Sequence, residues 1–118
     1  MSALDDLQTE INNSITQINQ ARAQLAAQVP NADVSHQSIL QSEILSLSLK
    51  EAQLQTAVFV ATAQDAKVRA AIASVTATTT SISNETANIK DVTSALGSVT
   101  KILGYVTKVL STIAPFLA

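Results

Sequence analysis

The sequence predicts an all-α protein, an elongated antiparallel bundle of three long helices that pack through heptad repeats. The chain of 118 residues has only two glycines, two prolines and three aromatic residues. A β-sandwich of this length needs more turn residues and more aromatic residues. Apolar residues recur at heptad spacing along most of the chain, as they do where helices pack side by side. By its length, the chain 1–118 is a single helical domain.

The first helix is predicted at residues 3–28. Its apolar residues recur every seven positions, at Leu4, Ile11, Ile18 and Leu25. Ser2 and Asp5 resemble a capping box at its start. Pro30 disfavours helical geometry in the residue before it, so the helix should end near Gln28.

A single apolar column with a spacing of seven covers the rest of the chain. Its members are Leu40, Leu47, Leu54, Ala61, Val68, Val75, Ile82, Ile89, Leu96, Leu103, Leu110 and Leu117. A second column beside it changes sides across residues 74–85, a stretch rich in Ser and Thr, which favour caps and turns. We therefore predict a middle helix at 34–77 and a third helix at 84–114, with Ser83 or Asn84 as its cap. The alternative is a four-helix bundle with an additional break near 62–65.

One short segment of the middle helix has a different pattern. Residues 45–49, LSLSL, alternate between apolar and polar as a strand does. Because they lie inside the stronger seven-residue pattern, we interpret them as helix.

Three polar residues are candidates for a chemical role. Glu51 and Asp65 interrupt the second apolar column, and if buried they would form an acidic site for a cation or a proton. The simpler interpretation places each at the edge of the helix packing, with Asp65 paired with Arg69 four residues later. Di-metal bundles use Glu-x-x-His pairs, which the chain lacks. His36, the only histidine, is expected to be exposed.

The sequence contains no motif typical of catalysis. It has no Gly-rich phosphate loop, no nucleophile elbow and no cysteine. We therefore expect no enzymatic activity and no bound cofactor or metal. A net charge of −2 with 14% charged residues is not typical of a nucleic-acid-binding protein. The N-terminal residues have no apolar stretch typical of a secretory signal, so a cytoplasmic start is expected, with leaderless export or membrane association as alternatives.

The C-terminal helix is the most apolar segment and carries the candidate interaction residues. Its apolar arc consists of Leu96, Val99, Ile102, Leu103, Val106, Val109, Leu110, Ile113 and Phe116. A narrow polar strip opposite the arc contains Gly97, Lys101, Gly104 and Lys108. The arc is wider than one neighbouring helix can cover, so we expect Ile102, Val109 and Phe116 to remain for another surface. The two glycines would permit close approach of another helix.

Two functions follow from this helix. Lys108 would lie near the middle of a membrane span, at a cost of roughly 2.5–3.5 kcal/mol, so a helix lying in the membrane surface fits better than a span. The seven-residue register, however, is what packing against protein requires. We therefore expect a non-enzymatic assembly protein that buries this helix against copies of itself, as a homo-oligomer, or against another helical protein. The alternative is a membrane-active protein, pore-forming or membrane-surface-binding, that inserts the helix into lipid.

Overall fold

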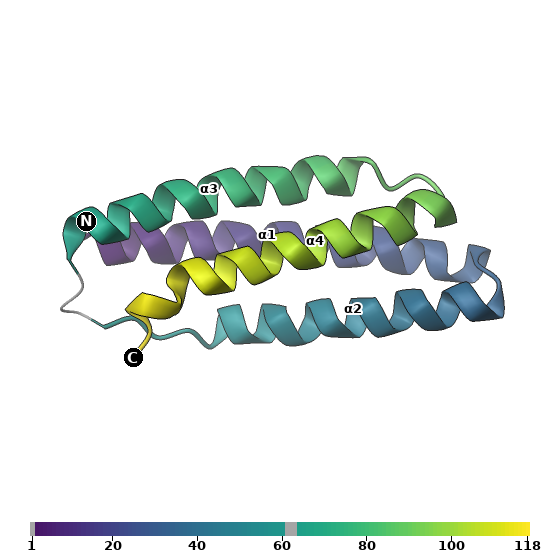
Figure 1. Ribbon diagram of the computed structural model, residues 1–118, viewed down its shortest axis with the longest axis horizontal. Helices are drawn as coiled ribbons and strands as arrows, with labels where there is room; N and C mark the ends of the chain where they lie inside the picture. The colour runs from purple at the N-terminus through teal and green to yellow at the C-terminus, as the bar shows by residue number, and fades with distance from the viewer. Residues whose placement is uncertain (1, 61–63) are drawn as a thin grey trace.

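The computed structural model describes residues 2–60 and 64–118, and these ranges contain four α-helices. The helices are α1 (Ala3–Gln28), α2 (Val34–Gln55), α3 (Asp65–Ala87) and α4 (Val92–Ile113), with short 3₁₀ turns at Val29–Asn31 and Ala114–Phe116. All four run along one long axis, and the molecule measures 50 × 23 × 17 Å (Figure 1).

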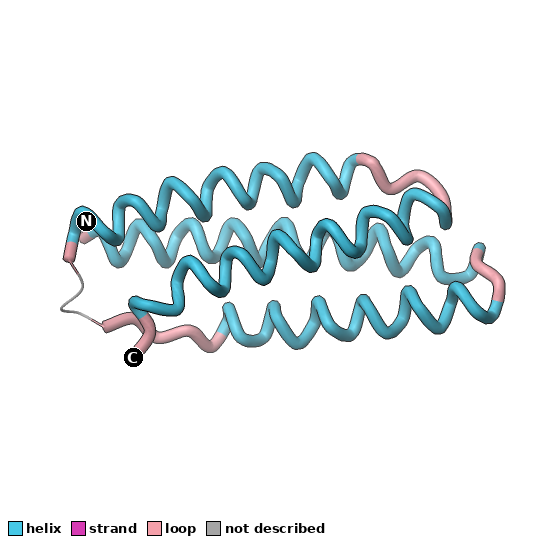
Figure 2. Tube along the Cα trace, in the orientation of Figure 1, coloured by secondary structure: helices cyan, strands magenta, loops and turns pink. Residues whose placement is uncertain are grey.

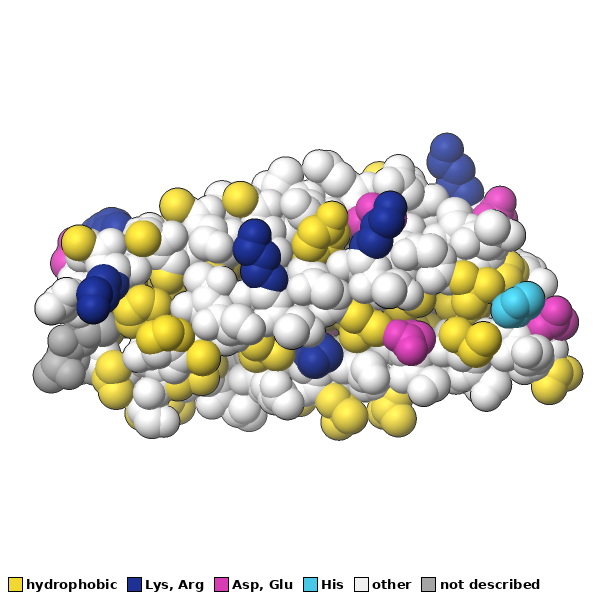
Figure 3. All heavy atoms as spheres, viewed as in Figure 1, with side chains coloured by type: hydrophobic (Ala, Val, Ile, Leu, Met, Phe, Trp, Pro, Cys, Tyr) yellow, Lys and Arg dark blue, Asp and Glu magenta, His cyan; other side chains and the backbone are white. Residues whose placement is uncertain are grey.

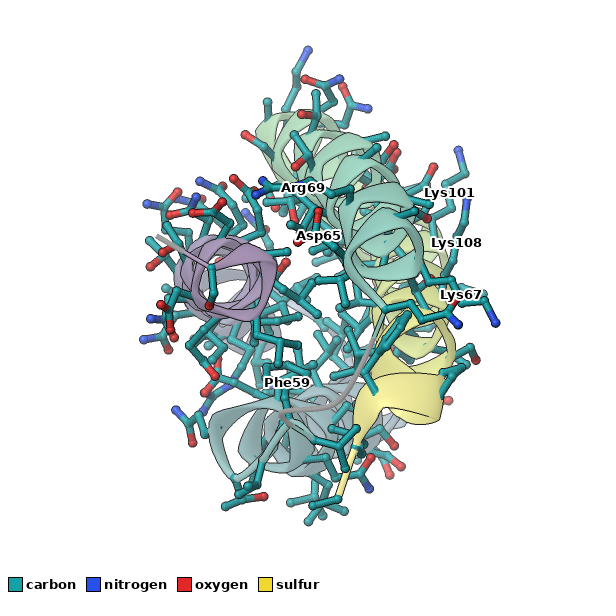
Figure 4. The ribbon with its side chains drawn as sticks, turned by 90° about the vertical axis from the view of Figure 1, so that its left-hand side faces the viewer. Phe59, Asp65, Lys67, Arg69, Lys101 and Lys108 are labelled. Atoms are coloured by element: carbon teal, nitrogen blue, oxygen red, sulfur yellow. The ribbon has the colours of Figure 1, made fainter. Side chains whose placement is uncertain are left out.

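The chain direction alternates from each helix to the next, and the two termini lie at the same end of the bundle (Figure 1). Around the bundle, α1 packs against α2 and α3, and α4 also packs against α2 and α3. In the end-on view, α2 and α3 occupy opposite corners (Figure 4). Neighbours in space are therefore the parallel pairs α1–α3 and α2–α4 and the antiparallel pairs α1–α2 and α3–α4.

The prediction of one continuous middle helix is wrong, because α2 ends at Gln55 and α3 begins at Asp65 (Figure 2). The described part of the chain forms the four-helix bundle that the alternative proposed. Its expected break near 62–65 falls partly on residues 62 and 63, which lie outside the described residues. Beyond the end of α2, the Val60 N–H donates to the carbonyl of Phe116, and the Ala118 N–H donates to that of Val58, each at 2.8 Å. These bonds between distant segments hold the chain out of helical geometry.

The predicted turn at 74–85 is also wrong, because α3 continues through this stretch to Ala87. Its hydroxyl groups donate to backbone carbonyls one turn earlier in the same helix, as Thr78 does to Ser74 at 2.8 Å and Thr86 to Ile82 at 2.8 Å. Such bonds satisfy Ser and Thr side chains inside a helix. The last helix therefore begins later than predicted, at Val92, and its cap is Asp91.

The first helix has the predicted bounds and the predicted cap. The Asp5 N–H donates to the Ser2 hydroxyl at 3.2 Å. Pro30 lies in the 3₁₀ turn that follows the helix. The Asp33 side chain then caps α2 by accepting the His36 N–H at 2.9 Å.

The heptad column describes the core in α2 and α3 but not in α4. Its members from Leu40 to Ile89 are buried wherever the structure describes them, whereas Ala61 lies outside the described residues. In α4, by contrast, Leu96, Leu103 and Leu110 are only half-buried. The core positions of this helix are Ala95, Val99, Ile102, Val106, Val109 and Ile113, which still follow spacings of three and four. The connection between α3 and α4 thus shifts the heptad register by one residue.

Candidate interaction surfaces

The apolar arc of α4 is largely buried inside its own bundle. Ile102 and Val109 have no exposed surface and Phe116 is 8% exposed, so the expectation that these three residues remain for another surface is wrong. The physical reason is the number of helices that pack around α4. The helix packs against α2 and α3 and also contacts α1, so three helices cover an arc that one could not.

The polar strip of α4 lies on the outside of the bundle. Gly97, Lys101, Gly104 and Lys108 are all exposed. A Cβ atom placed on either glycine would have no neighbour within 4 Å. Close packing within the chain therefore does not explain the two glycines.

The largest exposed apolar side chains of α2 point away from the core. Val34 is 84% exposed, and Leu45 and Leu49 are each 60% exposed. They share one side of the helix with exposed residues that are all uncharged. We call this set the outer α2 face: Val34, Ser38, Gln41, Ser42, Leu45, Leu49 and Ala52. Part of it forms the apolar surface along the lower edge of the molecule in Figure 3.

The opposite side of the same helix faces the core, where Leu40, Leu47 and Leu54 are completely buried. The helix is therefore apolar on two sides. Heptad analysis missed the outer α2 face because it follows only the side that enters the core. The signal was the alternation at 45–49, in which Leu47 points inward and its two leucine neighbours point outward.

Glu51 lies in the core side of α2 rather than at the edge of the helix packing. It is 5% exposed, and its Oε2 accepts a hydrogen bond from Arg22 Nη1 of α1 at 2.8 Å. Oε1 of Glu51 and Nε of Arg22 are buried, and neither has a hydrogen-bond partner among the residues that the structure describes. The interpretation of Glu51 as an edge residue is therefore wrong.

Asp65, by contrast, is exposed and lies 3.6 Å from Arg69 Nε, as the four-residue spacing predicted. Arg69 Nη1 also donates to Asp6 of α1 at 2.8 Å. This hydrogen bond to Asp6 raises the pKa of the guanidinium above its ordinary value. Arg69 thus connects the start of α3 to α1, and Asp65 lies beside it on the surface (Figure 4).

The remaining candidates do not form a chemical centre. His36 is exposed, and its Nδ1 lies 3.1 Å from Asp33 Oδ1. Within residues 2–60 and 64–118, no group of three or more His, Asp or Glu side chains is arranged to hold a metal ion. Over the same ranges, none of the helices combines the length and the apolarity needed to cross a bilayer.

We found no family model, no curated protein and no solved structure that matches this chain.

Proposed function

We propose that the protein is a non-enzymatic helical interaction protein that assembles with a second copy of itself through the outer α2 face. The observation that carries this proposal is that α2 is apolar on two opposite sides, with Leu47 buried and Leu45 and Leu49 exposed. A surface helix of a bundle needs one apolar side, whereas a helix that is apolar all round is typically buried. Grouped exposed apolar side chains are typical of contact surfaces.

The charges around this face favour a protein partner over lipid. The face itself carries no charge, and a helix that lies on an anionic membrane is typically rich in Lys and Arg. The lysine of α2, Lys50, occurs on the same side of the helix as Glu43, and both are half-buried roughly 100° or more around the helix from the leucines of the face. Because the lysine is offset by this carboxylate, attraction to anionic headgroups is weak.

The sequence of α2 is self-complementary when two copies of the helix pair in antiparallel orientation. Leu45 of one copy then lies opposite Leu49 of the other, about a midpoint at residue 47. A two-fold interface repeats this leucine contact twice.

Sedimentation velocity tests the proposal. We expect the wild-type protein to be a dimer at tens of micromolar, and the double change Leu45→Gln with Leu49→Gln to shift it to monomer. The control, Ala23→Gln with Ala27→Gln, introduces two glutamines at exposed i,i+4 positions of α1 and should leave the dimer intact. A monomeric wild type, or equal effects of the two double variants, would contradict self-association through α2.

A second candidate function, membrane activity, rests on α4. This helix segregates the buried arc around Ile102 and Val109 from an exposed strip that carries Lys101 and Lys108. Such segregation is typical of helices that lie in a membrane surface. Because the arc is covered by three helices, lipid binding through it requires α4 to leave the bundle.

Binding to anionic vesicles distinguishes this candidate from assembly. Insertion of α4 predicts that Lys101→Gln with Lys108→Gln weakens vesicle binding several-fold, since each lysine contributes about 1 kcal/mol at such a surface. Gly104→Leu should strengthen it, because it adds apolar area. Assembly through α2 predicts that neither change alters the dimer and that the protein does not bind vesicles.

A further inference from the structure

At the end of the bundle where the termini lie, a groove of about 690 Å³ opens between α3, the C-terminal turn and Val60. Its apolar lining includes Val60, Ala71 and Phe116, of which Ala71 and Phe116 are almost completely buried. This volume lies within the range of about 300–1,000 Å³ that is usual for small-molecule sites. Small side chains on α3, such as Ala70 and Ala71, leave the space open.

The groove is built by hydrogen bonds between distant parts of the chain. The Val60 N–H donates to the carbonyl of Phe116 at 2.8 Å, which places both side chains in the wall. The Leu117 N–H donates to the carbonyl of Ala114 at 3.3 Å and closes the turn that carries Pro115. The groove therefore belongs to the packed fold, and a ligand can reach it without any separation of the helices.

Lys67 is the charged residue that lines the groove, and the other lining side chains that the structure describes are neutral. Within the described part of the chain, Lys67 forms no ion pair, whereas the neighbouring Arg69 is held by Asp6 and Asp65. Figure 4 shows Lys67 on the same side of the bundle as Lys101 and Lys108. A cation thus lies at the edge of an apolar groove, on a side of the molecule that carries further lysines.

From this geometry we propose that the groove binds a small anionic amphiphile with a single aliphatic chain, such as a free fatty acid. The chain would lie along Val60, Ala71 and Phe116, and the carboxylate would pair with Lys67. Burial of an aliphatic chain provides binding energy in proportion to its apolar area. The lysine selects an anionic head over a cationic one. The site is separate from the outer α2 face, so its test does not depend on self-association.

Isothermal titration calorimetry with monomeric dodecanoate tests the site. We expect saturable binding with one molecule per chain. Ala70→Phe should abolish the binding, because an exposed ring on α3 would fill the groove without entering the core. Its matched control is Ala77→Phe, an exposed position one heptad further along α3 that does not line the groove and should bind normally.

The contribution of the Lys67 charge to binding is tested separately. Lys67→Gln should weaken dodecanoate binding about fivefold, the size expected for an exposed ion pair. Lys90→Gln, an exposed lysine at the other end of the bundle, should have no effect. Dodecyltrimethylammonium, which has the same chain and a positive head, should bind more weakly than dodecanoate to the wild type. The proposal is overturned if monomeric dodecanoate does not bind, if Ala70→Phe and Ala77→Phe act alike, if the two amphiphiles bind equally, or if binding occurs only to lipid vesicles.

Discussion

At the scale of single residues, the buried pair of Arg22 and Glu51 joins α1 to α2. Within the described part of the chain, one oxygen of the carboxylate is hydrogen-bonded and the other is not, and Arg22 Nη1 also donates to Asn19 Oδ1 at 3.4 Å. Burial of a carboxylate is costly unless its partner remains in place. The pair should therefore determine which face of α2 turns inward more than it adds to stability.

This view makes a prediction for a double-mutant cycle. Arg22→Leu should destabilise the protein by about 3 kcal/mol, the low end of the range for a broken buried pair, because the arginine is itself partly exposed. Arg22→Leu combined with Glu51→Leu should restore most of the loss, since no charge then remains buried. Urea unfolding measures the free energy of unfolding of both variants. Additive losses in the double variant would show that the pair does not act as a unit.

Asp91 makes a second prediction, which concerns pH. Its carboxylate accepts the Ser94 N–H at 2.8 Å, and Ser94 Oγ accepts the Asp91 N–H at 3.0 Å. The bond from the Ser94 backbone lowers the pKa of Asp91 below its ordinary 3.8, because it favours the charged form. The stability that the charged cap provides is therefore present above pH 3.8 and is lost as the pH falls through the lowered folded pKa.

Asp91→Asn keeps a good N-cap without the charge. The melting temperature of the wild type should exceed that of this variant at neutral pH, and the difference should disappear as the pH falls below the lowered pKa of Asp91. Circular dichroism melts over this range measure it. A difference that stays constant with pH would mean that the charge of Asp91 does not act on the folded state.

At the scale of elements, α4 provides a direct test of helix orientation. The heptad column predicts that Leu103 is a core residue, whereas the structure buries Ile102 completely and leaves Leu103 half-buried. Truncation of a buried isoleucine typically costs about 2–5 kcal/mol, so Ile102→Ala should destabilise the protein clearly more than Leu103→Ala. Urea unfolding of the two variants compares them. Equal losses, or a larger loss at Leu103, would contradict the observed register of α4.

The elements also show what the sequence can predict. The first helix follows from local signals, because Ser2, Pro30 and the apolar repeat each act on residues close to them in the sequence. The break after α2 depends on two hydrogen bonds with the C-terminal segment, one donated by the Val60 N–H and one accepted by the Val58 carbonyl, and no local pattern predicts them. Val68 continues the column in phase after the break, so periodicity alone could not reveal it.

The candidate surface was predicted less well than the fold, for a related reason. The width of the apolar arc on α4 was evident from the sequence, but how many helices cover it depends on the packing of the whole chain. The sequence signal for the outer α2 face was weaker and consisted of the alternation around Leu47. The face can be recognised only from the structure, which shows that Leu45 and Leu49 are exposed while other leucines of α2 fill the core.

At the scale of the whole molecule, the bundle covers its most apolar helix and leaves a less apolar one with two apolar sides. Contact between copies is therefore expected at α2, with Leu45 of one copy opposite Leu49 of the other across a two-fold axis. Introduced charges test this pairing. Leu45→Glu or Leu49→Lys alone places an unpaired charge against leucine, whereas the two changes together place opposite charges across an antiparallel pair and like charges across a parallel one.

The most direct measurement is sedimentation velocity of four proteins at equal concentration: the wild type, Leu45→Glu, Leu49→Lys and the variant with both changes. We predict a dimeric wild type, a clear shift toward monomer in each single variant, and recovery of the dimer in the double variant. A wild type that is monomeric at tens of micromolar, or a double variant as dissociated as the single ones, would contradict antiparallel self-association through the outer α2 face.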